Sequence, residues 1–362
     1  MRTDAALRLR PVFSALFANL RAGIPSAIGQ GDPAYAGKNR FSPPLIPPLH
    51  HPMKNSKIQD VVIAGGGPAG LSAALLLGRC LRDVILCDGG DVELGTFPST
   101  GGFLGLDGCH PIDLIRVGRE QCKKFETVRH LDSGIEHVER TITGFRVHFK
   151  DGTVAETRSL LIASDLIASL PAIVGAKEFH GTTFHQFPHC DGWDHRGQRL
   201  GVLGGGNHAV VLALKLLTWS NQVTLFTNGE SICSSSRQHL ADKGIALDSR
   251  PVHGLEGEDK ILEQVRMKDG SVVACQALFY PTPPMPHSDL AARLGCELNH
   301  LGRNSHSQTD CSTAVQGLFV AGNPSRAAEM AIISAAEGVK AAEAIHQWLS
   351  HADQSYLAVK IA

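Results

Sequence analysis

Three glycines near residue 65 have the spacing that brings a backbone close to a diphosphate. Gly65, Gly67 and Gly70 form the pattern G-x-G-x-x-G. The first glycine of such a pattern permits a tight turn, the second leaves room for the diphosphate, and the third lets a helix pack closely on a strand. A carboxylate about 20 residues later can accept hydrogen bonds from ribose hydroxyls. The predicted binding residues of this site are Gly65, Gly67, Pro68, Ala69, Gly70 and Asp88.

Two strands and a helix must position these residues. Residues 60–64 form a short apolar, β-branched run, and residues 68–77 have the apolar pattern of a helix. Residues 83–87 form the next expected strand, which ends at Asp88. The free amides at the start of the helix would face the phosphates. This order predicts the first unit of a dinucleotide-binding domain; glycines that serve only a tight turn are the alternative.

A second glycine motif begins at Gly204. The pattern is G-x-G-x-x-A, with Gly206 and Ala209 as its further members. It follows an expected strand at residues 200–203 and precedes an expected helix at 210–217. Two such units in one chain predict two dinucleotides, commonly a flavin and a nicotinamide.

The strand that follows the second motif differs from its counterpart in the first unit. Residues 223–226 are followed by Thr227-Asn-Gly229, so no acid stands there to hold a ribose hydroxyl and no adjacent arginine to hold a 2′-phosphate. Arg237 is the nearest basic candidate. The second unit is therefore interpreted either as a nicotinamide site or as a scaffold that no longer binds a nucleotide.

Cys190 and Asp191 lie between the two glycine motifs and are the residues best suited to redox and proton chemistry. Four nearby histidines have spacings that fit no zinc site: His180, His185, His189 and His195. A protonated His185 or His189 would lower the pKa of the Cys190 thiol and make it a nucleophile or an electron donor to a flavin. An inert cysteine is the alternative.

The composition excludes several classes of protein. Lys and Arg number 34 against 35 for Asp and Glu, so the chain lacks the basic excess of a nucleic-acid binder. No apolar stretch of about 18 residues predicts a membrane span. The cysteines number 9 and are never spaced as C-x-x-C, which is typical of a reducing compartment. We therefore expect a cytoplasmic protein that binds neither nucleic acid nor a membrane.

Residues 1–57 differ from the rest and are expected to be a disordered N-terminal extension. The segment is rich in arginine and then in proline, and is poor in acids. This is typical of a targeting peptide. The second interpretation is an over-extended start, because Met53 leads directly into the first expected strand. The segment is left out of the fold prediction.

The motifs occur in the order typical of one flavoprotein family. From about residue 58 to 350 the chain resembles the low-molecular-weight thioredoxin reductases, class II pyridine nucleotide-disulfide oxidoreductases. It is most similar to their thioredoxin-reductase-like bacterial flavoproteins and to fungal dithiol oxidases. The resemblance rests on these stretches in order: GGGPAG (65–70), GFLGLDG (102–108), LLIA (160–163), CDGW (190–193), GGG (204–206), SDLAARLG (288–295) and GLFVAGN (317–323).

The resemblance implies an α/β fold with two Rossmann-like dinucleotide-binding domains and mostly parallel central sheets. A FAD-binding domain at residues 58–165 and 284–350 would be interrupted by an NAD(P)-binding-type domain at 166–283. Residues 351–362 would form a C-terminal tail.

The resemblance also implies cofactors and partners. Ala163, Gly322 and Asn323 would contact FAD, and a helix at residues 330–345 would begin near the flavin ring, where its dipole favours a reduced anionic flavin. NAD(P)H is the possible second nucleotide. The protein would be a homodimer that exchanges electrons with a small molecule or a redox protein.

The chain departs from this family at the redox pair. Where the family has C-x-x-C, this chain has Phe187-Pro-His-Cys190, followed by Asp191 at the family's acid position. The retained cysteine corresponds to the one nearest the flavin. A lone thiol cannot cycle through an internal disulfide. Ordinary thioredoxin reduction is therefore not expected.

Four functions stay open. The first is FAD-dependent transfer of hydride or electrons between NAD(P)H or a reduced substrate and an acceptor. The second is dithiol or disulfide oxidoreduction in which Cys190 works with a substrate thiol. The third is a ferredoxin-NADP reductase-like activity, and the fourth is a non-catalytic flavin-binding redox sensor.

Further departures concern the cofactors. The family's alanine-threonine-glycine turn is Ala163-Ser-Asp165 here. Asn323 replaces an aspartate and can still hydrogen-bond a ribityl hydroxyl. The family's basic NADPH motif is matched by residues 227–229, so the nicotinamide preference is not predicted.

Overall fold

A computed structural model describes residues 58–89, 99–163, 170–281, 289–297, 310–322 and 330–361. The predicted N-terminal extension, the predicted FAD contact Asn323 and residues 164–165 lie outside these ranges. Within them, no helix is both long and apolar enough to cross a membrane.

The strands of the first unit form a sheet in the order β3-β2-β1-β6-β5-β4, and β15 also pairs with β6. The pairs among β3, β2, β1, β6 and β15 are parallel, whereas β5 is antiparallel to both β4 and β6. The bounds are β1 Gln59–Ala64, β2 Val84–Cys87, β3 Val128–Leu131, β4 Ile135–Thr141, β5 Gly144–Phe149, β6 Val154–Ile162 and β15 Leu318–Val320.

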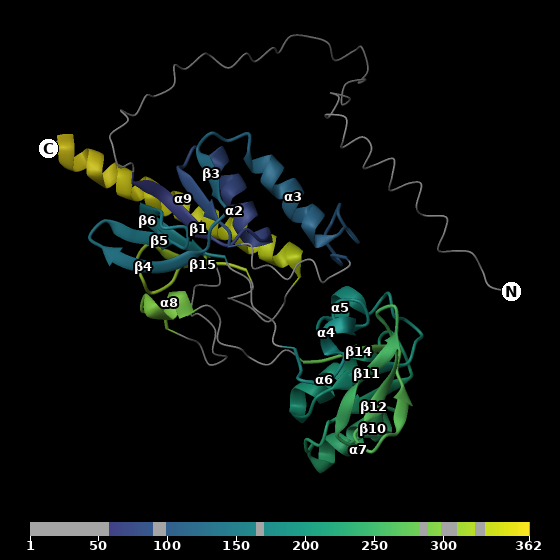
Figure 1. Ribbon diagram of the computed structural model, residues 1–362. Coiled ribbons are helices and arrows are strands. Elements are labelled where there is room, and N and C mark those ends of the chain that lie inside the picture. Colours follow the sequence, from purple (N-terminus) through teal and green to yellow (C-terminus); the bar gives the residue numbers. More distant parts are fainter. Residues whose placement is uncertain are drawn as a thin grey trace, which may run out of the picture. The chain divides into compact units, whose positions relative to one another are not determined.

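Alternate residues of β1 face opposite sides of this sheet, as the two-residue period of a strand requires. Val61 and Ile63 pack into a core with α2 and α9, whereas Val62 packs into a second core with β4, β5 and α8. Helix α2 also packs against α3 (Figure 1). The helix bounds are α2 Pro68–Arg79, α3 Pro111–Cys122, α8 Asp289–Arg293 and α9 Ala331–Ile361.

Helix α9 is longer than the sequence predicted. A helix at 330–345 and a tail at 351–362 were expected, but α9 runs over Ala331–Ile361. No proline interrupts this stretch and Gly338 is its single glycine, so nothing in the sequence ends the helix at residue 345. Gly338 lies where α9 meets α2, because a Cβ there would be 2.0 Å from the carbonyl oxygen of Ala69.

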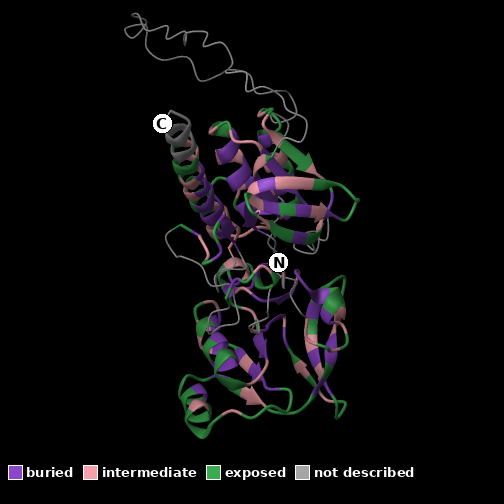
Figure 2. Cartoon of the chain, turned by 90° about the vertical axis from the view of Figure 1, so that its left-hand side faces the viewer, coloured by how far each residue is buried: buried purple, intermediate pink, exposed green. Residues whose placement is uncertain are grey.

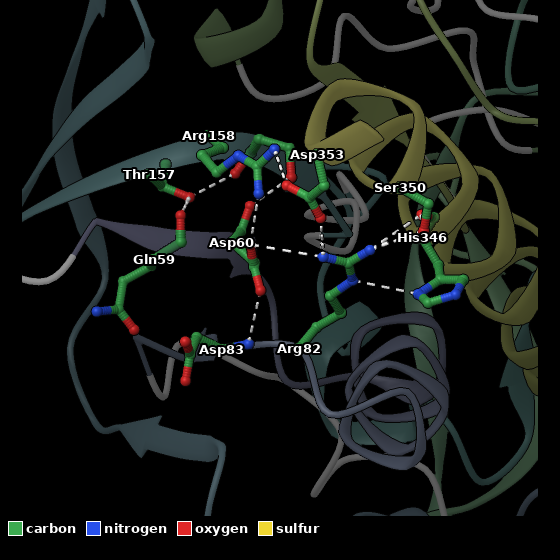
Figure 3. Close-up of polar contacts among 10 residues, drawn as sticks. Gln59, Asp60, Arg82, Asp83, Thr157, Arg158, His346, Ser350 and Asp353 are labelled. Carbon is green, nitrogen blue, oxygen red and sulfur yellow. Dashed lines mark hydrogen bonds and ion pairs between the residues drawn. The ribbon is translucent and has the colours of Figure 1, made fainter. Parts of the chain in front are cut away.

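Two arginines attach the far end of α9 to the sheet (Figure 3). Arg82, between α2 and β2, donates to Asp353 at 2.9 Å and to Nδ1 of His346 at 3.2 Å. Arg158 of β6 pairs with Asp60 of β1 at 3.1 Å and with Asp353 at 2.8 Å. The Arg82 side chain is only 12% exposed, whereas that of Asp353 is 43% exposed, so the arginine end of this pair is the shielded one.

The second unit contains a parallel sheet in the order β10-β9-β8-β14-β7 and a three-stranded antiparallel sheet, β11-β12-β13. The strand bounds are β7 Phe184–His185, β8 Leu200–Leu203, β9 Val223–Phe226, β10 Ala246–Asp248, β11 Val252–Glu258, β12 Ile261–Met267, β13 Val272–Ala274 and β14 Ala277–Phe279. The helix bounds are α4 Ala176–Phe179, α5 Pro188–Asp191, α6 Gly206–Leu216 and α7 Ser234–Asp242.

The parallel sheet of the second unit is covered on both faces. Val202 packs with α6 and α7, while Leu203 packs with the antiparallel strands. In both units the buried residues, purple in Figure 2, follow the strands and the sheet-facing sides of the helices. The predicted α/β fold with two Rossmann-like units and mostly parallel sheets is confirmed.

Candidate active site

The first glycine motif forms the turn between β1 and α2. Gly65 has φ +118°, which favours glycine, and its amide donates to the Cys87 carbonyl at 2.9 Å. A Cβ on Gly70 would lie 1.8 Å from the Gly65 carbonyl oxygen, so only glycine fits there. Gly67 caps α2 without a side-chain hydrogen bond, and Pro68 begins the helix. A helix start without a capping side chain offers its amides to a phosphate.

Asp88 follows β2 and lies against the glycine turn. A Cβ on Gly66 would be 2.2 Å from the Asp88 Oδ2 atom. The Asp88 side chain is 7% exposed, and Arg119 of α3 donates to the same oxygen at 2.7 Å. The sequence predicted this carboxylate beside the motif but gave no signal for its arginine partner.

Two distant segments meet the same turn. Ala163, directly after β6, donates from its amide to the Ala64 carbonyl at 2.8 Å. Gly322, after β15, has φ +82°, and a Cβ there would lie 3.0 Å from the Cβ of Ala69. The amide of Gly322 donates to Glu337 of α9 at 2.8 Å. The free amides at the start of α2 and the Asp88 carboxylate suit the phosphates and the ribose of a dinucleotide. Together with the segments at Ala163 and Gly322, which meet the same turn, they fit a dinucleotide such as FAD.

The second glycine motif repeats this construction between β8 and α6. Gly204 has φ +142°, and its amide donates to the Phe226 carbonyl at 2.9 Å. Gly206 begins α6, whose cap residue Gly205 makes no side-chain hydrogen bond. Ala209 is fully buried where the helix meets the sheet. The three predicted residues of this unit therefore lie together at the start of α6.

The second unit has an acid where the sequence indicated none. The chain turns back after β9, and a Cβ on Gly205 would lie 2.5 Å from the Glu230 Oε2 atom. The turn depends on positive φ at Asn228 (51°) and Gly229 (84°). The sequence analysis found no acid for this motif because it considered only the residues directly after the strand, and the structure places Glu230 beside the motif. The Asn-Gly pair, which is typical of a tight turn, was the available signal.

Cys190 and Asp191 lie together in the short helix α5. Cys190 is half-buried, and a Cβ on Gly101 would be 2.7 Å from its carbonyl oxygen. The Asp191 side chain is 19% exposed. Burial, together with the charge of Asp194, raises the pKa of Asp191 to about 7. Both protonation states of Asp191 are therefore populated near neutral pH.

A buried histidine pair lies beside Asp191. His185 of β7 is 3% exposed; its Nδ1 is 3.6 Å from Asp191 Oδ2, and its Nε2 is 2.9 Å from Nε2 of His195. Burial, and then the charge of His195, lowers the pKa of His185 to about 3. The hypothesis that a cationic His185 activates Cys190 is therefore wrong, since this ring is neutral at neutral pH. His189 instead packs edge-on against Trp219.

The contacts of this pair assign its hydrogens. Gln198 Oε1 can only accept, so Nδ1 of His195, 3.1 Å away, carries a hydrogen. Burial lowers the pKa of His195 as well, which leaves its Nε2 bare to accept from His185. Nδ1 of His185 is then bare and faces Asp191. A bare nitrogen favours a protonated carboxyl beside it.

Comparison with known proteins identifies the family of this chain. The family model of pyridine nucleotide-disulphide oxidoreductases matches residues 59–339. Thioredoxin reductase tcpT of Claviceps purpurea is 29% identical over 283 residues, which cover 75% of this chain and 88% of that protein.

Solved structures agree with the sequence comparison. The structure of HlmI superposes with a TM-score of 0.80 at 30% identity, over 85% of this chain and 100% of that one. An oxidoreductase from Agrobacterium tumefaciens has a TM-score of 0.73 at 27% identity, over 82% of this chain and 99% of that one. The chain therefore belongs to the pyridine nucleotide-disulphide oxidoreductase family and is a thioredoxin-reductase-like oxidoreductase.

Proposed function

We propose that this enzyme binds FAD at its first glycine motif, takes electrons from a nicotinamide dinucleotide at the second, and passes them to an acceptor at the Cys190–Asp191 site. The observation that carries the proposal is the proton-carrying carboxyl at Asp191, with a pKa of about 7, next to the single cysteine of this segment. When bound, FAD would supply the two-electron chemistry, while the protein supplies position and electrostatics.

The residues of the first unit have separable roles toward FAD. The free amides at the start of α2 and the glycine turn at Gly65 and Gly67 would hold the diphosphate. Asp88 would accept hydrogen bonds from the ribose, and Arg119 holds its carboxylate in place. Ala163, Gly322 and Asn323 would line the remainder of the flavin site.

Asp191 would move the proton that accompanies the electrons. A general acid or base works best when its pKa is near the working pH, and burial brings Asp191 to that value. The neutral pair of His185 and His195 fixes the surroundings of the carboxyl without adding a charge. Asp191 can therefore give a proton to a reduced acceptor, or to the Cys190 thiolate, and regain it from solvent.

The acceptor is not expected to be reduced through an internal disulfide. Phe187 stands where the family's first redox cysteine would be, and the chain contains no C-x-x-C pair. The second candidate function follows from this. A Cys190 thiolate would attack a substrate disulfide, forming a mixed disulfide and releasing one substrate thiolate, which takes its proton from Asp191. A substrate thiol, whose proton passes to the Asp191 carboxylate, would then attack the mixed disulfide, form a new substrate disulfide and release Cys190 as a thiolate. The net reaction is thiol–disulfide exchange, in which the substrate thiol replaces the missing resolving cysteine.

Cys190→Ser separates the two candidates. In the leading function the variant still binds FAD, and NADH or NADPH still reduces the flavin, because neither step forms or breaks a bond to the Cys190 sulfur. In the second function, thiol-dependent turnover falls to background. Cys233→Ser is the matched control, since Cys233 is exposed and hydrogen bonds with the hydroxyls of Ser235 and Ser236 lower the pKa of its thiol to about 7.

The two readouts decide the assignment. Nucleotide-driven flavin reduction by Cys190→Ser, measured by absorbance, supports the leading function. Unchanged thiol-dependent turnover in the same variant rules out the second. Loss of turnover in Cys233→Ser, with Cys190→Ser unaffected, would move the reactive thiol to a different place in the fold.

A further inference from the structure

In each of the two glycine motifs a carboxylate lies against the glycine at the second position. In the first unit a Cβ on Gly66 would be 2.2 Å from Asp88 Oδ2. In the second unit a Cβ on Gly205 would be 2.5 Å from Glu230 Oε2. Gly66 and Gly205 both occupy the second position of their motif. Glu230 therefore lies, relative to its motif, where Asp88 lies relative to the first.

The backbones of the two units correspond residue by residue at this point. In each unit the amide of the first glycine donates a hydrogen bond to the last residue of the neighbouring strand. The amide of the residue after that strand donates a hydrogen bond to the next strand. These bonds are Gly65 N to Cys87 O (2.9 Å), Asp88 N to Leu131 O (3.0 Å), Gly204 N to Phe226 O (2.9 Å) and Thr227 N to Asp248 O (2.9 Å). In this correspondence the backbone of Thr227 matches the backbone of Asp88. The carboxylate of Glu230 matches the carboxylate of Asp88.

A fixed turn connects the two residues. The amide of Glu230 donates to the Thr227 carbonyl at 2.9 Å. Asn228, at the head of the turn, accepts from the Val252 amide at 2.8 Å, which ties the turn to β11. Thr227 is 1% exposed, and its hydroxyl has no hydrogen-bond partner among the described residues.

We propose that Glu230 makes the second unit selective for NAD(H) over NADP(H). Its carboxylate would accept hydrogen bonds from the 2′- and 3′-hydroxyls of the adenosine ribose, as acids at this place do in dinucleotide-binding folds. A 2′-phosphate would instead bring negative charge against the carboxylate. The proposal deepens the proposed function, on which it rests, by naming its nicotinamide donor.

Two arginines follow this turn in the sequence, Arg237 and Arg250. Arg250 is held by Asp248 at 2.5 Å and by Asp269 at 3.3 Å. Arg237 on α7 is exposed and lies one turn of helix beyond the cap residue Cys233. Arg237 is therefore the rival determinant, because a 2′-phosphate requires a basic partner.

The test measures nucleotide affinity rather than turnover. The full-length, FAD-loaded protein is titrated with NAD+ and with NADP+ by calorimetry. The wild type is expected to bind NAD+ at least about tenfold more tightly, since a hydrogen bond to a charged group contributes that order of affinity. Glu230→Gln keeps the size and removes the charge, and it should lower the NAD+ to NADP+ affinity ratio by about tenfold. Arg237→Ala should leave the ratio unchanged.

The outcomes separate this proposal from the proposed function. Equal or tighter binding of NADP+ by the wild type, or a ratio that follows Arg237 and not Glu230, would overturn the role of Glu230 and leave the flavin chemistry standing. Preferential NAD+ binding by a chain that retains no FAD would support Glu230 and overturn the proposed function. Because Glu230 is exposed, unchanged circular dichroism is expected for Glu230→Gln and checks its fold.

Discussion

At the scale of single residues, the pairing of Asp191 with His185 sets the chemistry of the site. An isolated buried aspartate and an isolated buried histidine both lose their charge, because burial disfavours the charged form of either group. Here burial raises the pKa of Asp191 to about 7 and lowers that of His185 to about 3. Between pH 4 and 6 the folded protein therefore holds a proton on the Asp191 carboxyl and none on His185. In the unfolded chain the proton is on the His185 imidazole instead. Between about pH 3 and about pH 7 both groups are therefore mostly uncharged in the folded protein.

The two groups make opposite contributions to the pH dependence of stability. Between about pH 4 and 7 the folded state holds a proton on Asp191 that the unfolded state lacks, so this term loses stability as pH rises. Between about pH 3 and 6.5 the unfolded state holds a proton on His185 that the folded state lacks, so this term gains stability as pH rises. In the wild type the two terms largely cancel.

Single substitutions should reveal the contribution of each group to the pH dependence of stability. Relative to wild type, Asp191→Asn is expected to gain stability as pH rises from 4 to 7, by about 1.4 kcal/mol per pH unit. His185→Gln is expected to show the opposite slope from pH 3.5 to 6.5. Urea unfolding of the three proteins across this range measures both. Parallel pH profiles for wild type and both variants would show that the two groups do not share a proton in this way.

At the scale of elements, α9 and the two arginines that attach it stabilise the first unit. Gly338 brings α9 into close contact with α2, whose first residues form the glycine turn. The same helix carries Glu337, which accepts from the Gly322 amide at 2.8 Å. The far end of α9 is attached through Asp353 to Arg82 and Arg158. The helix thus links the glycine turn at one end to the start of the sheet at the other.

Removing the shielded arginine should cost far more than removing an exposed one. Arg82→Ala breaks several hydrogen bonds at a side chain that is 12% exposed, and we expect it to lower the free energy of unfolding by about 3 kcal/mol. Arg116→Ala is the matched control, because its pair with Asp113 is exposed at both ends and such pairs contribute about 0.5 kcal/mol or less. Denaturant unfolding compares them. Equal losses would show that the α9 attachment does not stabilise the fold.

The elements also show which parts of the site a sequence can predict. The glycine spacings predicted both turns and their helices, because Gly65 and Gly204 have positive φ and Gly70 has no room for a Cβ, local requirements that favour glycine. Glu230 was missed because its place depends on two consecutive positive φ values, at Asn228 and Gly229, that carry the chain back toward the motif. The pair of His185 and His195 was missed because the turn after α5 brings His195 back against β7, and no sequence spacing encodes that contact.

At the scale of the whole molecule, one supersecondary unit occurs twice with the same internal bonds. Each copy has a glycine turn, an uncapped helix and a carboxylate against the second glycine of its motif. In the proposed function the two motifs would provide a donor site and a flavin site, and the segment with Cys190 and Asp191 lies between the two motifs in the sequence. Phe187 replaces the first cysteine of the family's pair, so a route from a bound flavin to the acceptor would differ from a C-x-x-C relay.

The central claim is that a nicotinamide dinucleotide reduces FAD bound to this chain. Anaerobic mixing of the full-length, FAD-loaded protein with NADH, and separately with NADPH, tests it directly through the flavin absorbance. We expect the bound flavin to bleach, at lower concentrations of NADH than of NADPH. A bound flavin that stays oxidised with both nucleotides would contradict the claim.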